Sequence, residues 1–190
     1  MHIDGILAEV ARRPAVGGVR IIGVDGPAGA GKSTLAARLA AAAHAPIVEI
    51  DDFISWDDPT GERWWPRFDA QVLQPLLRGE DAHFQERDWT DWRGDSLGGW
   101  KTVPHHDIVV VEGVTCTRRC TVGRLAFAVF VEAPEDVRLR RGLARDHGQS
   151  YDVEALWRAW MVKEQEFFAA DGTRERADLI VQTGDGSTPV

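Results

Sequence analysis

The most constraining feature of this 190-residue sequence is a glycine-rich stretch that ends in Gly-Lys-Ser. Residues 26–33 read G-P-A-G-A-G-K-S, which fits the phosphate-loop pattern G-x-x-x-x-G-K-[ST]. An apolar, β-branched run at 19–24 precedes it, and the alanine- and leucine-rich residues 32–43 predict a helix. This order of strand, glycine-rich turn and helix is the context in which such a loop binds phosphate.

Each residue type in the loop suits an anion. Glycines can adopt positive φ, so the backbone N–H groups can curl around a phosphate, and the helix N-terminus adds partial positive charge. We expect Lys32 to reach the β- and γ-phosphate oxygens and the Ser33 hydroxyl to bind Mg²⁺. The residues expected to hold the nucleotide are Gly26, Pro27, Ala28, Gly29, Ala30, Gly31, Lys32, Ser33 and Thr34.

Apolar runs alternate with helical patterns along the rest of the chain. Further strands are expected at 46–50, 107–111, 125–131 and 177–182, and a hairpin between 83–89 and 99–103. Helices are expected at 3–13, 68–77, 134–146 and 152–169. We therefore predict one domain over residues 1–190 with an α/β fold, a P-loop NTPase-type parallel sheet of about five strands with helices on both faces.

Composition excludes several other classes of protein. Two cysteines cannot build a disulfide scaffold, and no apolar run approaches the roughly 20 residues of a membrane span. The net charge of −8 disfavours a nucleic-acid partner. The N-terminal residues lack a secretory pattern, so we expect a cytoplasmic protein with no membrane partner, and homo-oligomerisation stays open.

Carboxylates follow two of the expected strands. Asp51 and Asp52 come after the strand at 46–50, and Glu112 follows the strand at 107–111. Ligands gather at the carboxyl ends of parallel strands, so we expect Asp51 and Glu112 to face the phosphate loop, where Mg²⁺ and a base are needed. Asp52 is a weaker candidate because adjacent side chains point apart in an extended chain. Asp25, just before the loop, would either contact phosphate-bound water or cap the turn, and the cap is the favoured interpretation.

Arginines cluster in the expected helix at 134–146. Arg138, Arg141 and Arg145 share one face by their spacing. They would form either an ordinary solvated face or a lid over 134–150, in which arginines stabilise charge on the γ-phosphate and exclude water. In the second interpretation Arg138 and Arg141 are catalytic and Arg145 contacts the nucleotide.

A tryptophan-rich acidic segment lies between the second and third expected strands. Residues 51–95 hold twelve Asp and Glu against five Arg. The indoles would either pack a small local core or line an acceptor pocket. The expected acceptor-binding residues are Asp51, Trp56, Trp64, Trp65, Arg87, Trp89, Trp92 and Glu112. Trp157 and Trp160, in the expected helix at 152–169, are expected to pack against a neighbouring element.

The motifs occur in an order that resembles the uridine kinase and phosphoribulokinase group of P-loop kinases, over residues 20–184. After the loop come D-D-F at 51–53, V-V-V-E-G at 109–113, R-L-R-R at 138–141 and A-D-L-I-V at 177–181. The resemblance implies that Asp51 is the general base, that Glu112 organises Mg²⁺ and that the lid arginines contact the triphosphate. It divides the chain into a core at 19–53 and 104–184, an acceptor-binding segment at 54–103 and a lid at 134–150.

The departures from this group fall in the acceptor-binding segment. Ile54 stands where a uridine kinase usually has Tyr, the family's Y-D-F element reads Arg87-Asp88-Trp89, and Trp92 replaces its following His. We therefore predict an ATP- and Mg²⁺-dependent kinase whose acceptor is a neutral or cationic hydroxylated molecule such as a nucleoside or sugar. Two alternatives stay open, a nucleoside monophosphate kinase, since the loop also resembles that of cytidylate kinases, and a nucleotide-dependent switch ATPase with no small-molecule acceptor.

Overall fold

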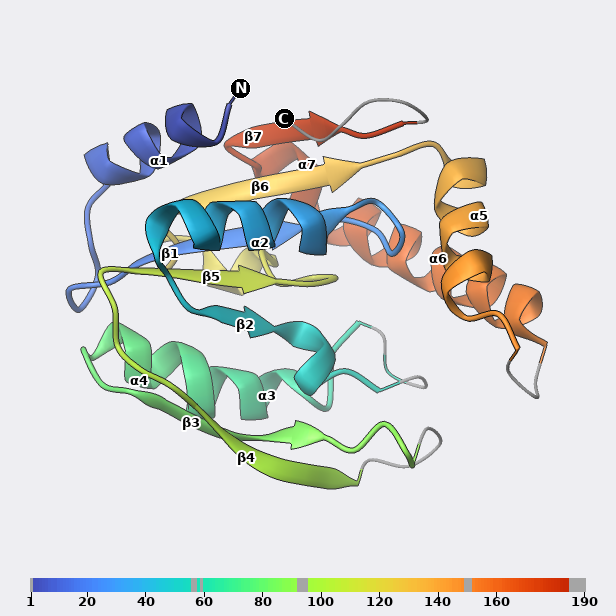
Figure 1. Cartoon of the computed structure of the whole chain (residues 1–190), viewed down its shortest axis with the longest axis horizontal. Helices are drawn as coiled ribbons and strands as arrows, with labels where there is room; N and C mark the ends of the chain where they lie inside the picture. The colour runs from blue at the N-terminus through green and yellow to red at the C-terminus, as the bar shows by residue number, and fades with distance from the viewer. Residues whose placement is uncertain (1, 56–57, 59, 92–95, 149–151, 185–190) are drawn as a thin grey trace.

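A five-stranded parallel sheet forms the centre of the molecule (Figure 1). The computed structural model describes residues 2–55, 58, 60–91, 96–148 and 152–184. The strands, in spatial order, are β2 (Ile47–Glu49), β5 (Ile108–Glu112), β1 (Arg20–Asp25), β6 (Phe127–Glu132) and β7 (Leu179–Gln182). The predicted α/β fold with about five parallel strands is therefore confirmed.

The central strands are apolar because both of their faces are covered. Along β5, Val109 and Val111 belong to one buried cluster and Val110 to the other, as the alternation of side chains along a strand requires. The parallel register pairs Val24 of β1 with Glu112 of β5, and Glu49 of β2 with the same residue. This register brings the ends of three strands to one edge of the sheet.

Helices cover the sheet and its carboxyl edge (Figure 1). Helix α2 (Lys32–Ala43) packs on the sheet, and α1 (Ile3–Arg12) packs against α2 through buried Ile6 and Val10. Helix α5 (Glu135–Arg145) lies at the carboxyl edge and packs against α6 (Val153–Asp171), which leads into the short α7 (Thr173–Arg176). Asp152 caps α6 by accepting a hydrogen bond from the Ala155 N–H.

The segment between β2 and β5 forms a separate layer beside β2 (Figure 1). A short 3-10 turn (Ile50–Asp52) leads to a helix that starts earlier than the predicted residue 68. It runs through α3 (Trp65–Phe68), a π turn (Asp69–Leu73) and α4 (Gln74–Leu77). The predicted hairpin is confirmed as β3 (Ala82–Arg87) and β4 (Leu97–Val103). The rings of Phe53, Phe68 and Phe84 contact one another and belong to the same buried cluster as Val109 and Val111 of β5, so they join this layer to one face of the sheet.

The other predicted elements are also present. The predicted helix at 32–43 matches α2 at both ends, and no end of the others shifts by more than two residues. The shifts occur where capping residues and short turns replace the ends of apolar runs, for example at β2, which stops at Glu49. In the described part of the chain, no helix has both the length and the apolar character that crossing a bilayer demands.

Candidate functional site

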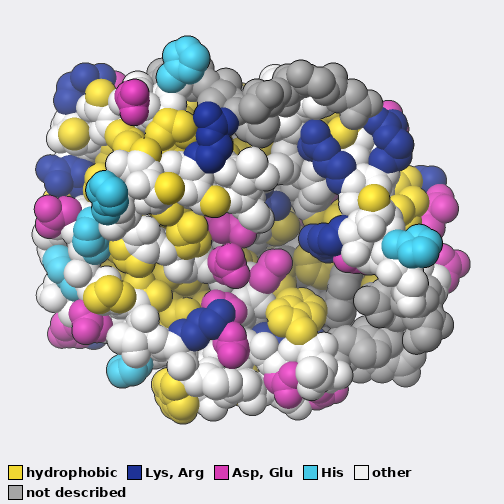
Figure 2. Space-filling view, in the orientation of Figure 1, with side chains coloured by type: hydrophobic (Ala, Val, Ile, Leu, Met, Phe, Trp, Pro, Cys, Tyr) yellow, Lys and Arg dark blue, Asp and Glu magenta, His cyan; other side chains and the backbone are white. Residues whose placement is uncertain are grey.

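A cavity of about 730 Å³ opens at the carboxyl edge of the sheet (Figure 2). The phosphate loop, the 3-10 turn after β2, the end of β5, and helices α5 and α6 all contribute to its wall. Acidic side chains gather on one side of the hollow, and Lys and Arg side chains on the other (Figure 2). The cavity, called the main cavity below, therefore has the location that the sheet topology predicts for a ligand site.

The glycine-rich loop adopts the backbone that only glycine accommodates easily. Gly26 has a φ of 130°, and a Cβ atom there would lie 2.0 Å from the Val131 carbonyl oxygen. Gly31 caps α2 with a φ of 98°. The loop thus curls tightly between β1 and α2 and lines the main cavity with Gly29, Gly31 and the first residues of the helix.

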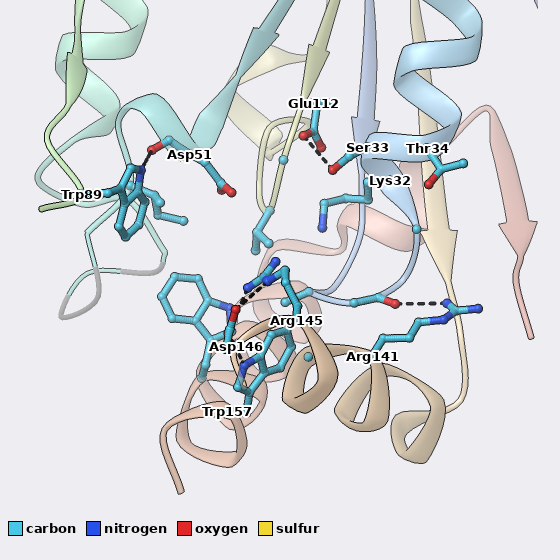
Figure 3. Close-up of a pocket in the computed structure, with 18 of the residues that line it drawn as sticks. Lys32, Ser33, Thr34, Asp51, Trp89, Glu112, Arg141, Arg145, Asp146 and Trp157 are labelled. Atoms are coloured by element: carbon cyan, nitrogen blue, oxygen red, sulfur yellow. Dashed lines mark hydrogen bonds and ion pairs between the residues drawn. The ribbon is translucent and has the colours of Figure 1, made fainter. Parts of the chain in front are cut away.

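Lys32 and Ser33 stand at the start of α2 (Figure 3). The Lys32 ammonium donates a hydrogen bond of 3.2 Å to the Pro27 carbonyl across the loop. The Ser33 hydroxyl donates one of 3.0 Å to Glu112 Oε1. These contacts bring together the residues that the sequence predicted for the phosphates and for Mg²⁺, with Thr34 beside them in the cavity wall.

The two predicted carboxylates line the same cavity (Figure 3). Glu112 ends β5, and its burial raises the pKa of its carboxyl, while Lys32 opposes the rise and Asp51 adds to it. The neighbouring Asp52 turns away into an ion pair of 2.7 Å with Lys101. The side chains of Asp51 and Asp52 therefore point apart, as expected. The cause is the 3-10 turn in which both residues lie, and not an extended strand.

The donor set suits a hard cation. Mg²⁺ is held in proteins by few protein oxygens, usually one or two carboxylates, together with phosphate oxygens and waters. Glu112 and Ser33 supply a carboxylate and a hydroxyl 3.0 Å apart beside the phosphate loop, and Asp51 supplies a second carboxylate in the same wall. Across the described residues, no cluster of three or more His, Cys, Asp or Glu forms a protein-only metal cage.

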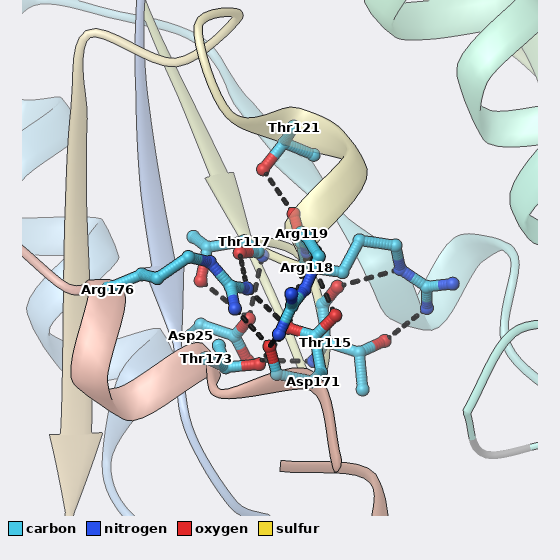
Figure 4. A network of polar contacts seen from close by, with 9 residues as sticks. All are labelled: Asp25, Thr115, Thr117, Arg118, Arg119, Thr121, Asp171, Thr173 and Arg176. Carbon is cyan, nitrogen blue, oxygen red and sulfur yellow. Dashed lines mark hydrogen bonds and ion pairs between the residues drawn. The ribbon is translucent and has the colours of Figure 1, made fainter. Parts of the chain in front are cut away.

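Asp25 has a structural role at the junction of the site (Figure 4). Its fully buried carboxylate accepts hydrogen bonds from the backbone N–H groups of Gly26, Thr115 and Thr117, each of 2.7 Å, and from the Thr117 hydroxyl at 2.9 Å. Burial nevertheless raises the pKa of Asp25. The carboxylate thus fastens the phosphate loop to the loop that follows Glu112, in line with the predicted capping role.

Three of the four arginines of α5, namely Arg138, Arg141 and Arg145, occupy different environments. Arg141 and Arg145 line the main cavity, whereas Arg138 does not. Arg138 forms an ion pair of 2.6 Å with Glu164 of α6, and both side chains are largely buried. The sequence interpretation of Arg138 as a lid residue over the nucleotide overlooked this partner, because Glu164 lies 26 positions further along the chain.

Arg145 belongs to a contact between α5 and α6 that the sequence did not predict. Its guanidinium pairs with Asp146 at 2.8 Å and lies 5.2 Å from the ring of Trp157. The Trp157 indole donates a hydrogen bond of 2.8 Å to Asp146. Trp157 therefore packs against α5, and Trp160 packs against the buried cluster that contains Trp64 and Phe68, so each contacts a neighbouring element as expected, but both also line the main cavity. The i, i+3 spacing of the two tryptophans, which places them on one face of the helix, could have indicated that they share this wall.

The predicted acceptor-binding tryptophans separate into two groups. Trp89 lines the main cavity, but Trp64 and Trp65 do not. Trp64 is buried and donates its indole N–H to the Asp58 carbonyl at 3.0 Å, so it packs a local core around a smaller cavity of about 210 Å³. The Arg118 guanidinium lies 4.0 Å from the ring of Trp65. Trp56 and Trp92, also predicted acceptor-binding residues, lie outside the described residues.

Trp89 is held by two contacts beside Asp51. Its indole donates a hydrogen bond of 3.2 Å to the Asp51 backbone carbonyl (Figure 3). The buried Arg87 guanidinium lies 4.4 Å from the Trp89 ring and also donates to the Ile54 carbonyl at 2.9 Å. Arg87 was predicted to bind the acceptor directly, but it lines only the smaller cavity and supports Trp89 from behind the wall.

Comparison with known proteins yields likeness at the level of fold. A scan against family models gives no match, and no curated protein matches the sequence. Among solved structures, a candidate fructose transport system kinase from Silicibacter sp. TM1040 is similar with a TM-score of 0.74 at 20% identity, covering 95% of this chain and 98% of that one. A possible uridine kinase from Bacillus stearothermophilus follows at 0.68 and 18%, covering 94% and 96%.

A third similar structure extends the same pattern to another substrate. The D-glycerate 3-kinase from Cryptococcus neoformans var. grubii has a TM-score of 0.60 at 13% identity and covers 99% of this chain and 96% of that one. The three neighbours, two of which are described only as candidate kinases, are thus assigned to different small molecules, and they share this fold with the present chain over nearly its full length.

Proposed function

We propose that this protein is an ATP-dependent kinase that phosphorylates a hydroxyl group of a small molecule. The proposal rests on one observation, namely that the phosphate loop, the Ser33–Glu112 pair and the carboxylate of Asp51 share a single cavity. A phosphoryl-transfer site needs phosphate ligands, oxygen ligands for Mg²⁺ and a base for the acceptor hydroxyl. The similarity in fold to three small-molecule kinases supports this assignment.

The triphosphate would lie along the loop formed by residues 26–33. The backbone N–H groups of the loop and the ammonium of Lys32 would bind phosphate oxygens, and Thr34 and Arg145 would complete the nucleotide site. Ser33 and Glu112, with Asp51, would hold Mg²⁺ together with those oxygens, and the bound ion supplies charge stabilisation to the phosphates. Arg141, in the cavity wall, is the lid arginine that we place nearest the phosphates.

Asp51 is the proposed general base. Its carboxylate removes the proton from the acceptor hydroxyl as that oxygen attacks the γ-phosphorus in line. A new phosphorus–oxygen bond forms, the bond to the oxygen that bridges the β- and γ-phosphorus breaks, and ADP departs with those electrons. The helices α5 and α6 close the cavity on the side opposite Asp51, and exclusion of water there would limit hydrolysis of ATP.

The acceptor would be neutral or cationic. Within the described residues, three cations line the main cavity. Lys32 belongs to the phosphate loop, Arg141 binds the loop carbonyl of Gly29 at 3.1 Å, and Arg145 pairs with Asp146. Each therefore has a role other than binding an anionic acceptor, which disfavours a nucleoside monophosphate. We assign the acceptor to residues 54–103, with Trp89 as its main contact, and the lid to residues 134–150.

The experiment measures ADP release from Mg–ATP with a panel of nucleosides, sugars, amino alcohols and their monophosphates. We expect Lys32→Ala to lower turnover at least 100-fold and Asp51→Asn at least 100-fold. Lys163→Ala, exposed on α6, and Asp107→Asn, exposed before β5, are matched controls that should leave the rate unchanged. Near-normal turnover of Asp51→Asn would exclude it as the base.

The same panel tests the assigned acceptor contact and the competing functions. Trp89→Ala should raise the acceptor KM about tenfold without changing ATP affinity, whereas Trp100→Ala, 65% exposed on β4, should change neither. Turnover restricted to monophosphates would favour the nucleoside monophosphate kinase. ATP binding without turnover of any acceptor would favour the switch ATPase.

A further inference from the structure

The backbone carbonyls of the phosphate loop accept a set of hydrogen bonds that the proposed chemistry does not explain. Three consecutive loop carbonyls each accept a hydrogen bond from outside the loop. Arg138 donates to the Ala28 carbonyl at 3.3 Å and Arg141 to the Gly29 carbonyl at 3.1 Å. The Thr183 hydroxyl, which follows β7, donates to the Ala30 carbonyl at 2.7 Å. The loop is therefore held through its carbonyls by α5 and by the chain after β7, with Arg141 also lining the main cavity.

These contacts determine where the loop's N–H groups point. In a planar trans peptide the carbonyl of one residue and the N–H of the next point in opposite directions. Fixing the carbonyls of Ala28 and Ala30 outward consequently turns the N–H groups of Gly29 and Gly31 toward the main cavity, whose wall both glycines form. Inward N–H groups are what an anion-binding loop needs.

Glu164 of α6 is the centre of this arrangement. Its side chain is 1% exposed, and its two oxygens have different partners, the Ala28 N–H at 2.9 Å and Arg138 Nη1 at 2.6 Å. The loop, α5 and α6 therefore meet at one buried carboxylate. A buried carboxylate is costly unless it is paired and hydrogen-bonded, and here both oxygens are satisfied.

Helix α5 approaches the phosphate loop so closely that no side chain fits between their backbones. A Cβ atom on Gly29 would lie 2.7 Å from the Arg138 carbonyl oxygen, so the helix backbone already touches the loop. Because the helix is pressed against the loop here, the Arg138 side chain can satisfy Glu164 and the loop carbonyl together. This geometry assigns Arg138 to the loop itself and not to a mobile lid.

We propose that Glu164 and Arg138 are positioning residues that pre-organise the phosphate loop for the triphosphate. They act through the loop backbone and do not touch the transferred group. This inference rests on the proposed nucleotide site, but its structural half, the fixed loop, is independent of what the site binds.

The test compares affinity for a triphosphate with affinity for a ligand that lacks phosphates. In Glu164→Ala we expect calorimetry to give at least tenfold weaker binding of Mg–ATP and of inorganic tripolyphosphate, with adenosine affinity unchanged. Glu164→Gln, which keeps an oxygen for the Ala28 N–H, should recover part of the loss. Glu166→Gln, exposed on the same helix, is the matched control. A general structural defect would weaken all ligands alike, and that outcome would overturn the proposal.

A second measurement tests the loop without any ligand. Amide hydrogen exchange of residues 26–31 should quicken at least tenfold in Glu164→Ala and in Arg138→Met, and the double variant should add little to either. Unchanged exchange in both variants would overturn the inference. If the wild-type protein binds no triphosphate but shows this pattern, the proposed function fails while the positioning of the loop stands.

Discussion

Replacing Asp25 by Asn tests the junction that joins the two halves of the site. The change keeps the size of the side chain but replaces one carboxylate oxygen with an NH₂ group. Oδ1 accepts from Gly26 and Thr115, and Oδ2 accepts from the N–H and hydroxyl of Thr117. The least harmful orientation places the NH₂ group at Oδ2, where the Thr117 hydroxyl can rotate to accept but the Thr117 N–H loses its partner.

The expected cost follows from these contacts. One buried N–H without a partner costs about 1–3 kcal/mol, and two hydrogen bonds that lose a charged acceptor weaken by about 1 kcal/mol each. Removing a fully buried charge offsets part of this loss of stability, because the charged form is costly to bury, as the raised pKa of Asp25 shows. We therefore expect the free energy of unfolding to fall by about 2–4 kcal/mol, and Tm by roughly 10 °C.

Urea denaturation followed by tryptophan fluorescence measures this loss at pH 7. The m-value should stay constant, because the surface exposed on unfolding does not change. Asp107→Asn, at an exposed position, should cost less than about 0.5 kcal/mol. A loss below about 1 kcal/mol for Asp25→Asn would mean that the hydrogen bonds of this carboxylate do not hold the two loops together, and the reasoning would be refuted.

Two further changes test contacts outside the junction. Hydrogen bonds from Arg174 at 2.7 and 2.8 Å lower the pKa of Glu132, so its contribution is present above its unfolded pKa and is lost as pH falls through the lowered folded value. Arg174→Gln should therefore lower the free energy of unfolding measured by urea denaturation at pH 7 but leave it almost unchanged near pH 2, and an equal loss at both pH values would contradict the pairing. In Gly142→Ala the new Cβ would lie 2.3 Å from the Trp157 ring, so overpacking should outweigh the gain in helix propensity. We expect a net loss of about 1–2 kcal/mol with altered tryptophan fluorescence, and a gain in stability would show that α5 and α6 separate freely.

The local sequence determined most of the secondary structure and the part of the site that the glycine-rich loop forms. Buried strands such as β1 and β5 are continuous apolar runs, and their order with intervening helices leaves few alternatives to a parallel sheet. The loop at 26–33 follows from steric requirements that only glycine meets easily at several positions. Asp51 and Glu112 reach the same cavity because the carboxyl ends of neighbouring parallel strands meet at one edge, which the chain order predicted.

Tertiary structure decided the roles of side chains whose partners are distant in sequence. Arg138 could be placed on a helix face from its spacing, but only packing brings Glu164 of α6 against it. Tryptophan at 64 and at 89 looks equally suited to a pocket, yet the fold buries the first and leaves the second in the wall of the main cavity. Periodicity fixes which way a side chain points along its own helix or strand, whereas burial and pairing depend on what the rest of the chain places opposite it.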